Sequence, residues 1–202
     1  MNQNEFGGFG DQASITLNTS AKANELVGVE GHYTVTCRDK DGNLKWEEAF
    51  PNLVVAAGKE LLLDTLLRTS GTYTTVGPFL GLTSATLTPA ATDIMSTIVP
   101  SSEFTNYTVG GSAVRGTAVF AASTSSGTTP TNVTTCAASP ITYTITGGGG
   151  TVYGCFLVTG SGASSAQGNT GGTLYSVGNF ATAKITTAGD TVAVTYSATA
   201  TS

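Results

Sequence analysis

The sequence predicts a mostly β fold: a β-sandwich or jelly-roll-like antiparallel domain with one short α-helix and an extended N-terminal arm. Short runs rich in Val, Thr, Tyr and Phe recur along the chain, and glycine-containing turns separate them. Only one stretch has helical spacing of apolar residues. Short strands with a single helix favour two packed antiparallel sheets over a parallel α/β fold.

A β-hairpin is predicted at the start of the domain. Tyr33, Val35 and Cys37 alternate with polar residues, which is typical of a strand with one buried face. A turn with Asp-Gly at its centre follows at residues 39–43, and the alternation resumes around Trp46. Residues 72–83 predict a further strand pair, broken at Gly-Pro.

A short helix is predicted over residues 57–68. Leu62 and Leu66 are four residues apart, as are Leu63 and Leu67, so these leucines form one apolar stripe. A helix of about a dozen residues is marginal alone in water, so we expect the stripe to dock on the sheet. The side chains expected to organise the core are Trp46, Phe50, Leu62, Leu63, Leu66 and Leu67.

The chain divides into an arm, residues 1–28, and a single β domain, residues 29–202. The first segment has no sustained period, which is typical of a leader without fixed structure. The alternative is an extended arm that lies over a neighbouring subunit, because a solvating tail does not usually carry several large apolar residues. The residues expected to dock the arm are Phe6, Phe9, Ile15 and Leu17.

The second half of the chain predicts six short strands. Residues 147–150, four glycines, are predicted to link two of them as a hairpin, and Gly189 with Asp190 closes the last pair. Residues 84–112 predict a long loop with a function or an unrecognised strand. The expected strands are 114–122, 141–146, 152–159, 173–180, 183–187 and 191–198.

The composition favours a component of an assembly. Only 10% of the 202 residues are charged, against about 25% in ordinary soluble domains. Six of the eight basic and ten of the thirteen acidic residues lie within residues 1–68. The net charge of −5, without a basic cluster, argues against nucleic-acid binding. The sequence has no apolar run long enough to predict a membrane span, and no signal peptide is expected.

The sequence predicts no catalytic, metal or cofactor site. His32 is the only histidine, and Glu47 and Glu48 are adjacent, so they point to opposite faces of a strand. The tetraglycine lacks the Lys-Ser/Thr of a phosphate-binding loop. We expect all three cysteines to be buried apolar side chains in a reducing cytosol. Strand aromatics could line a glycan site, although core packing is the commoner role; they are Tyr143, Tyr153, Phe156, Tyr175, Phe180 and Tyr196.

Several segments between residues 31 and 198 resemble small virion structural proteins of tailed bacteriophages. These segments are WEEAFPNLVV at 46–55, GKE with the leucine-rich run at 58–67, GPFLGL at 77–82, GCFL at 154–157, GTLYS at 172–176 and GDTV at 189–192. The resemblance implies a non-enzymatic capsid decoration or cement protein and brings no active-site residue.

The expected partners are the major capsid protein and further copies of the chain, without nucleic acid, membrane or cofactor. The expected location is the virion, after synthesis in the host cytoplasm. Two alternatives remain open: a tail or fibre module that recognises host-surface glycans, and, with less support, a polysaccharide-degrading tail enzyme.

Overall fold

The computed structural model describes residues 28–67, 76–125, 132–135 and 138–201. The described chain is mostly β and its strands pair antiparallel, which confirms the predicted fold class. The arm predicted at residues 1–28 lies outside the described residues, apart from its last residue.

The described chain forms two helices and twelve strands. The helices are α1 (Ala56–Leu67) and α2 (Met95–Ile98). The strands of the first half are β1 (Gly28–Arg38), β2 (Leu44–Val54), β3 (Phe79–Thr83), β4 (Glu103–Phe104), β5 (Tyr107–Thr108) and β6 (Gly116–Thr117). Those of the second half are β7 (Thr124–Ser125), β8 (Asn132–Thr135), β9 (Ile141–Ile145), β10 (Gly150–Thr159), β11 (Thr173–Thr186) and β12 (Thr191–Thr201).

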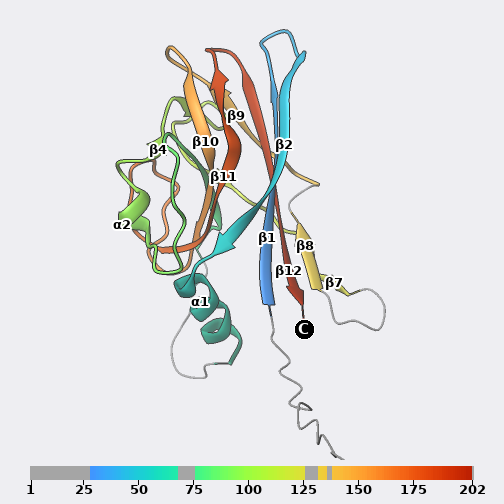
Figure 1. Cartoon of the computed structure of the whole chain (residues 1–202), viewed down its shortest axis with the longest axis vertical. Helices are drawn as coiled ribbons and strands as arrows, with labels where there is room; N and C mark the ends of the chain where they lie inside the picture. The colour runs from blue at the N-terminus through green and yellow to red at the C-terminus, as the bar shows by residue number, and fades with distance from the viewer. Residues whose placement is uncertain (1–27, 68–75, 126–131, 136–137, 202) are drawn as a thin grey trace, which may run out of the picture.

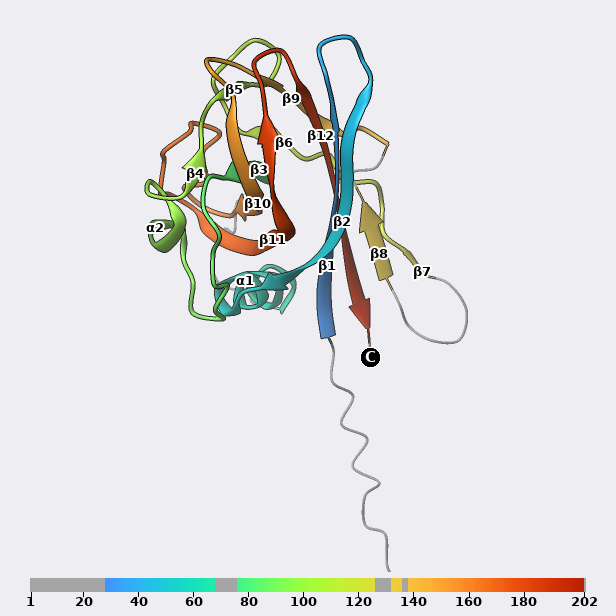
Figure 2. The same ribbon diagram turned by 45° about the horizontal axis from the view of Figure 1, so that its top comes forward.

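The strands form one continuous antiparallel sheet that curls until it is nearly barrel-shaped (Figures 1 and 2). Its main order is β4-β3-β10-β11-β2-β1-β12-β8-β7, and β9 pairs with β12 and β5. Strand β2 joins the two halves because it pairs with β1 along most of its length and with β11 only at Leu53 and Val54. The predicted β1–β2 hairpin is confirmed.

The main core lies inside the curled sheet. Alternate residues of β1 are buried opposite buried residues of β12, and Tyr33 lies opposite Tyr196 with ring centroids 4.8 Å apart. Phe50 is buried between Tyr33 and Phe180, at 5.4 and 5.0 Å, as expected of a core-organising residue. Trp46 is only partly buried and packs edge-on against Phe180 at the border of this core.

Both predicted glycine-linked hairpins are wrong. Residues 147–150 connect β9 to β10, but β9 pairs with β12 and β5, while β10 pairs with β11 and β3. Gly189 and Asp190 likewise connect β11 to β12, which have different partners. Gly149 adopts a φ of 76°, and a Cβ there would collide with the carbonyl of Thr186. The glycines therefore lie in connections between strands that belong to different parts of the sheet.

Other sequence predictions need smaller corrections. The predicted loop at 84–112 contains the one-turn helix α2 and the short strands β4 and β5. The strands predicted at 173–180 and 183–187 form a single strand, β11, and the strand predicted at 114–122 is reduced to β6. Of the pair predicted at 72–83, β3 is described and residues 72–75 lie outside the described residues.

A buried ion pair holds the long loops together. The guanidinium of Arg115 binds the carboxylate of Glu103 through two contacts of 2.7 and 2.8 Å, and both side chains are fully buried. Arg115 also donates to the backbone oxygens of Ser164 and Asn169, and the Gly168 amide donates to Glu103. The charge of Arg115 thus has a structural role, since Glu103 and the backbone oxygens that it binds join β4 to the segment around residues 164–169.

Candidate docking surface

Helix α1 lies at the end of the barrel where β1 begins and β12 ends (Figure 1). Its first turn packs on β11, because Gly58 has no side chain: a Cβ there would lie 2.6 Å from the carbonyl oxygen of Tyr175. Ala57 packs against a second, smaller core, which includes Val55, Met95 and Val177, and Leu61 lies against Gly160. The residues at positions 57, 58 and 61 therefore form the inner face of the helix.

This orientation corrects the predicted role of the leucine stripe. Leu62, Leu63 and Leu67 are 42, 56 and 71% exposed and do not organise the core. The side chain of Leu66 lies outside the described part of the structure. The helix begins and ends one residue earlier than predicted. Successive residues turn by about 100°, so docking through Gly58 leaves Leu62 only about 40° away from the inner face but turns Leu63 and Leu67 outward, by about 140 and 180°. The small residues at positions 57 and 58 were the available signal.

Three adjacent hollows have volumes of about 170, 150 and 180 Å³, and α1 lines the second and the third. All three are lined by Tyr175, and neighbouring hollows share Leu62, Thr159 or Ala198. We call them together the apolar groove. Its lining comprises Val29, Leu61, Leu62, Thr65, Pro78, Phe120, Ser123, Leu157, Thr159, Tyr175, Tyr196, Ala198, Thr199 and Ala200.

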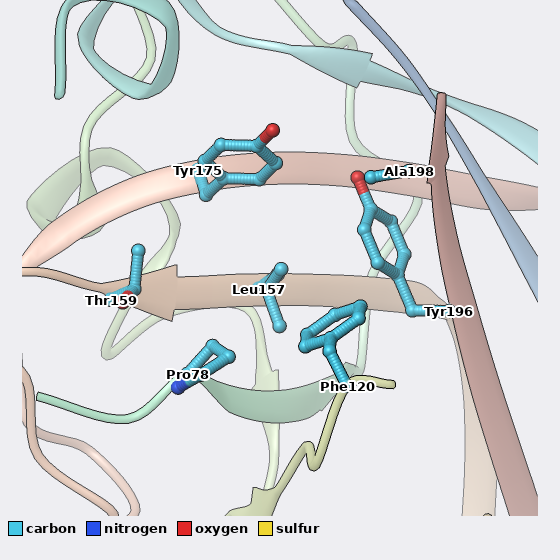
Figure 3. A pocket seen from close by; sticks show the side chains of 7 residues that line it. All are labelled: Pro78, Phe120, Leu157, Thr159, Tyr175, Tyr196 and Ala198. Carbon is cyan, nitrogen blue, oxygen red and sulfur yellow. The ribbon is translucent and has the colours of Figure 1, made fainter. Parts of the chain in front are cut away.

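Figure 3 shows the first hollow, where side chains from five segments surround a common space. Tyr175 on β11 and Leu157 on β10 form one side, and Phe120 and Tyr196 lie across from Tyr175. The ring of Phe120 packs edge-on against that of Tyr196 at 6.0 Å. The walls thus come from the ordered barrel, with Phe120 added by the connection after β6.

The polar groups in the first hollow are largely occupied. The Thr159 hydroxyl donates to the carbonyl of Val76 at 3.2 Å, and the Tyr196 hydroxyl accepts from the Asn52 amide at 3.1 Å. Burial, followed by the neighbouring Tyr196, raises the pKa of Tyr175 to about 12, so this phenol is neutral at physiological pH. The hollow therefore suits an apolar side chain better than a charged group.

The other end of the barrel carries the turn at residues 39–43, where charged groups bind one another. Both Asp41 and Asn43 donate backbone amides to Asp39, at 2.9 and 2.8 Å. Lys45 pairs with the buried carboxylate of Asp190 at 2.5 Å. We call residues 38–45 with Asp190 the charged tip.

The structure places His32, Glu47 and Glu48, which the sequence does not assign to a catalytic site, on the neighbouring strands β1 and β2. His32 is exposed on β1, Glu47 is exposed on β2, and Glu48 pairs with Lys184 at 2.7 Å. Burial by itself raises the pKa of Glu48, but Lys184 and the Ala181 amide outweigh it and lower that pKa. Among the residues that the structure describes, no group of His, Cys, Asp and Glu could hold a metal ion.

The cysteines and aromatics are mostly core residues. Cys37 and Cys155 are free and buried, and burial raises the pKa of both thiols, that of Cys37 to about 11. Cys136 lies outside the described residues. Of the six aromatics considered for a glycan site, four are buried; they are Tyr143, Phe156, Phe180 and Tyr196.

The arm residues Phe6, Phe9, Ile15 and Leu17 lie outside the described residues. Tyr175, which lines all three hollows of the apolar groove, is predicted from the sequence as a core aromatic or part of a glycan site and not as part of a docking surface. No helix in the described ranges is long and apolar enough to cross a membrane.

Comparison of the chain with protein-family profiles, curated proteins and solved structures gives no match. We call the exposed leucines of α1 together with the apolar groove the apolar end. The functional proposal therefore depends on the geometry of the apolar end and on the sequence itself.

Proposed function

We propose that the protein is a non-enzymatic structural component of a virion, a capsid decoration or cement protein that binds the capsid exterior and stabilises contacts between capsomers. The observation that carries this proposal is the outward-facing leucines of α1 beside the apolar groove. Apolar surface gathered at one end of a folded domain is characteristic of an assembly interface. The resemblance to small virion proteins of tailed bacteriophages indicates which kind of assembly.

The distribution of charge also supports an assembled state. A free-standing protein uses surface charge to remain dispersed, whereas residues 69–202 carry only five charged side chains. A surface covered by neighbouring subunits needs fewer charges. We therefore assign the apolar end to contacts within the particle and the charged tip to solvent.

Weak contacts at this end are sufficient on a particle. Complete burial of one leucine contributes about 2 kcal/mol, and the leucines of α1 are already partly covered, so each adds less. Many copies attached to one lattice nevertheless hold firmly, because a second contact forms at high effective concentration. A cement protein can thus act without a deep binding site.

The glycan-binding alternative has less support from the groove. Sugars are bound through hydrogen bonds as well as aromatic faces, yet two of the three hydroxyl side chains in the first hollow already bind within the protein. A polysaccharide-degrading activity has still less support, since the carboxylates of Glu48, Glu103 and Asp190 are engaged in ion pairs with lysine or arginine.

Copy number in purified particles tests the proposed function. A decoration protein is present in hundreds of copies per virion, which quantitative mass spectrometry measures against the major capsid protein. A handful of copies would instead place the chain in the tail. Purified protein should also bind particles that lack it and raise the temperature at which their capsids open; failure of both would reject a cement role.

A further inference from the structure

The apolar groove lies where the N-terminal segment joins the barrel. Strand β1 begins at Gly28, and the next residue, Val29, lines the groove and pairs with Ala200 of β12, which lines it too. Residues 1–27 are therefore attached at the rim of the groove. The groove is therefore the apolar surface nearest to the point where that segment is attached.

The length and composition of this segment suit an apolar groove. Its 27 residues span at most about 90 Å when extended. Ile15 and Leu17 are two residues apart, so in an extended chain both point to the same side. They lie 13 and 11 residues before Gly28, a reach of roughly 35 to 45 Å. Hollows of about 150 to 180 Å³ have the size to take such side chains.

Docking of the segment on a second copy of the chain covers more of the exposed apolar surface than docking on its own barrel. A segment that entered its own groove would have to turn back within the residues that separate Leu17 from Val29. It would also leave Leu63 and Leu67 uncovered, because these side chains do not line the hollows. Two copies placed end to end about a two-fold axis bring each segment to the other's groove and cover both helices.

We propose that the apolar ends of two copies meet and exchange their N-terminal segments, with Ile15 and Leu17 of each copy seated in the apolar groove of the other. This inference rests on the proposed function and names the neighbour that covers the apolar end. Reciprocal exchange ties the two copies of a pair together, because each copy contributes both an arm and a groove.

A mixing experiment with full-length variants tests the exchange. The arm variant is I15D/L17D and the groove variant is Leu62→Asp, which changes a side chain that is already 42% exposed. Each variant alone should dimerise at least tenfold more weakly than the unchanged chain in analytical ultracentrifugation. An equimolar mixture should dimerise more strongly than either variant alone, because a mixed pair has one contact between an intact arm and an intact groove.

Leu44→Asp at the charged tip is the matched control and should dimerise like the unchanged chain, since Leu44 is 55% exposed and begins β2, which starts at the opposite end of the barrel from α1 (Figure 1). Circular dichroism verifies that each variant is folded. An unchanged chain that stays monomeric at all concentrations, or a mixture that dimerises no better than its components, would overturn the exchange.

The mixing experiment needs no particles, so its result is separate from that of the proposed function. Binding to particles without recovery in the mixture would reject only the exchange. Recovery in the mixture with a handful of copies per virion would reject the cement role and leave the exchange standing.

Discussion

The two ends of the barrel differ in whether their side chains find partners within the chain. At the charged tip, Asp39 accepts two backbone amides and Asp190 accepts Lys45, so these charges are bound within the chain. At the apolar end, Leu63 and Leu67 remain more than half exposed. A surface whose groups are paired internally gains little from a partner, whereas exposed leucines gain from any surface that covers them.

The position of α1 on β11 should be the most sensitive feature of the apolar end. Replacing Gly58 by Ala in a helix normally stabilises it by about 1 kcal/mol. Here the added Cβ would lie 2.6 Å from the Tyr175 carbonyl oxygen, and overpacking against backbone costs about 1 to 3 kcal/mol. The difference between these two terms leaves a net loss, and we therefore expect Gly58→Ala to lower the free energy of unfolding by up to about 2 kcal/mol in urea titrations.

Gly148→Ala is the control for this substitution, because a Cβ at Gly148 meets nothing within 4 Å. It should change the free energy of unfolding by less than about 0.5 kcal/mol. A stabilised Gly58→Ala protein would show that α1 does not pack on β11 through this residue, and the outward position of the leucines would lose its basis.

The internal pairing of the charged tip predicts a pH dependence. Burial by itself raises the pKa of Asp190, but hydrogen bonds from Lys45 and Thr187 outweigh it and lower that pKa below its ordinary 3.8. Its contribution is therefore fully present above pH 3.8 and is lost as the pH falls through the lowered value. Asp190→Asn should cost about 1 to 2 kcal/mol at pH 7.

Urea titrations between pH 2 and 7 measure this effect, and the difference between the unchanged protein and Asp190→Asn should shrink at the acid end. Asp41→Asn is the control, because the Asp41 side chain is 63% exposed. A difference that is constant with pH would show that Asp190 is not held as a carboxylate by Lys45.

Substitution of one exposed leucine at each end should barely change stability but should affect self-association at one end only. Leu44 at the charged tip and Leu63 on α1 are 55 and 56% exposed. Replacing either by Gln should change the free energy of unfolding by less than about 0.5 kcal/mol. Only Leu63→Gln should weaken self-association in ultracentrifugation. Equal weakening by both variants would remove the functional difference between the ends.

The features that could be predicted from the sequence are those that depend on neighbouring residues. The β1–β2 hairpin follows from alternation around a five-residue turn, and the bounds of α1 follow from leucine spacing. Both signals lie within about a dozen residues, where chain geometry alone decides which side chains share a face.

The features that could not be predicted depend on distant parts of the chain. The inner face of α1 is set by the approach of Gly58 to Tyr175, 117 positions away, and leucine spacing carries no information about that contact. The tetraglycine at 147–150 permits a sharp reversal, but the pairing of β9 with β12 is decided by the whole sheet. The apolar groove could not be located for the same reason, since its walls come from β1, β10, β11, β12 and α1.

Hydroxyl-radical footprinting of the protein, free at low concentration and bound to particles, tests most directly whether the apolar end is the assembly surface. We expect oxidation of Leu62, Leu63 and Leu67 to fall severalfold on the particle, while Leu44 and Ile185, which are 55 and 70% exposed, react as in the free protein. Unchanged oxidation of the α1 leucines together with protection of Leu44 would contradict the account.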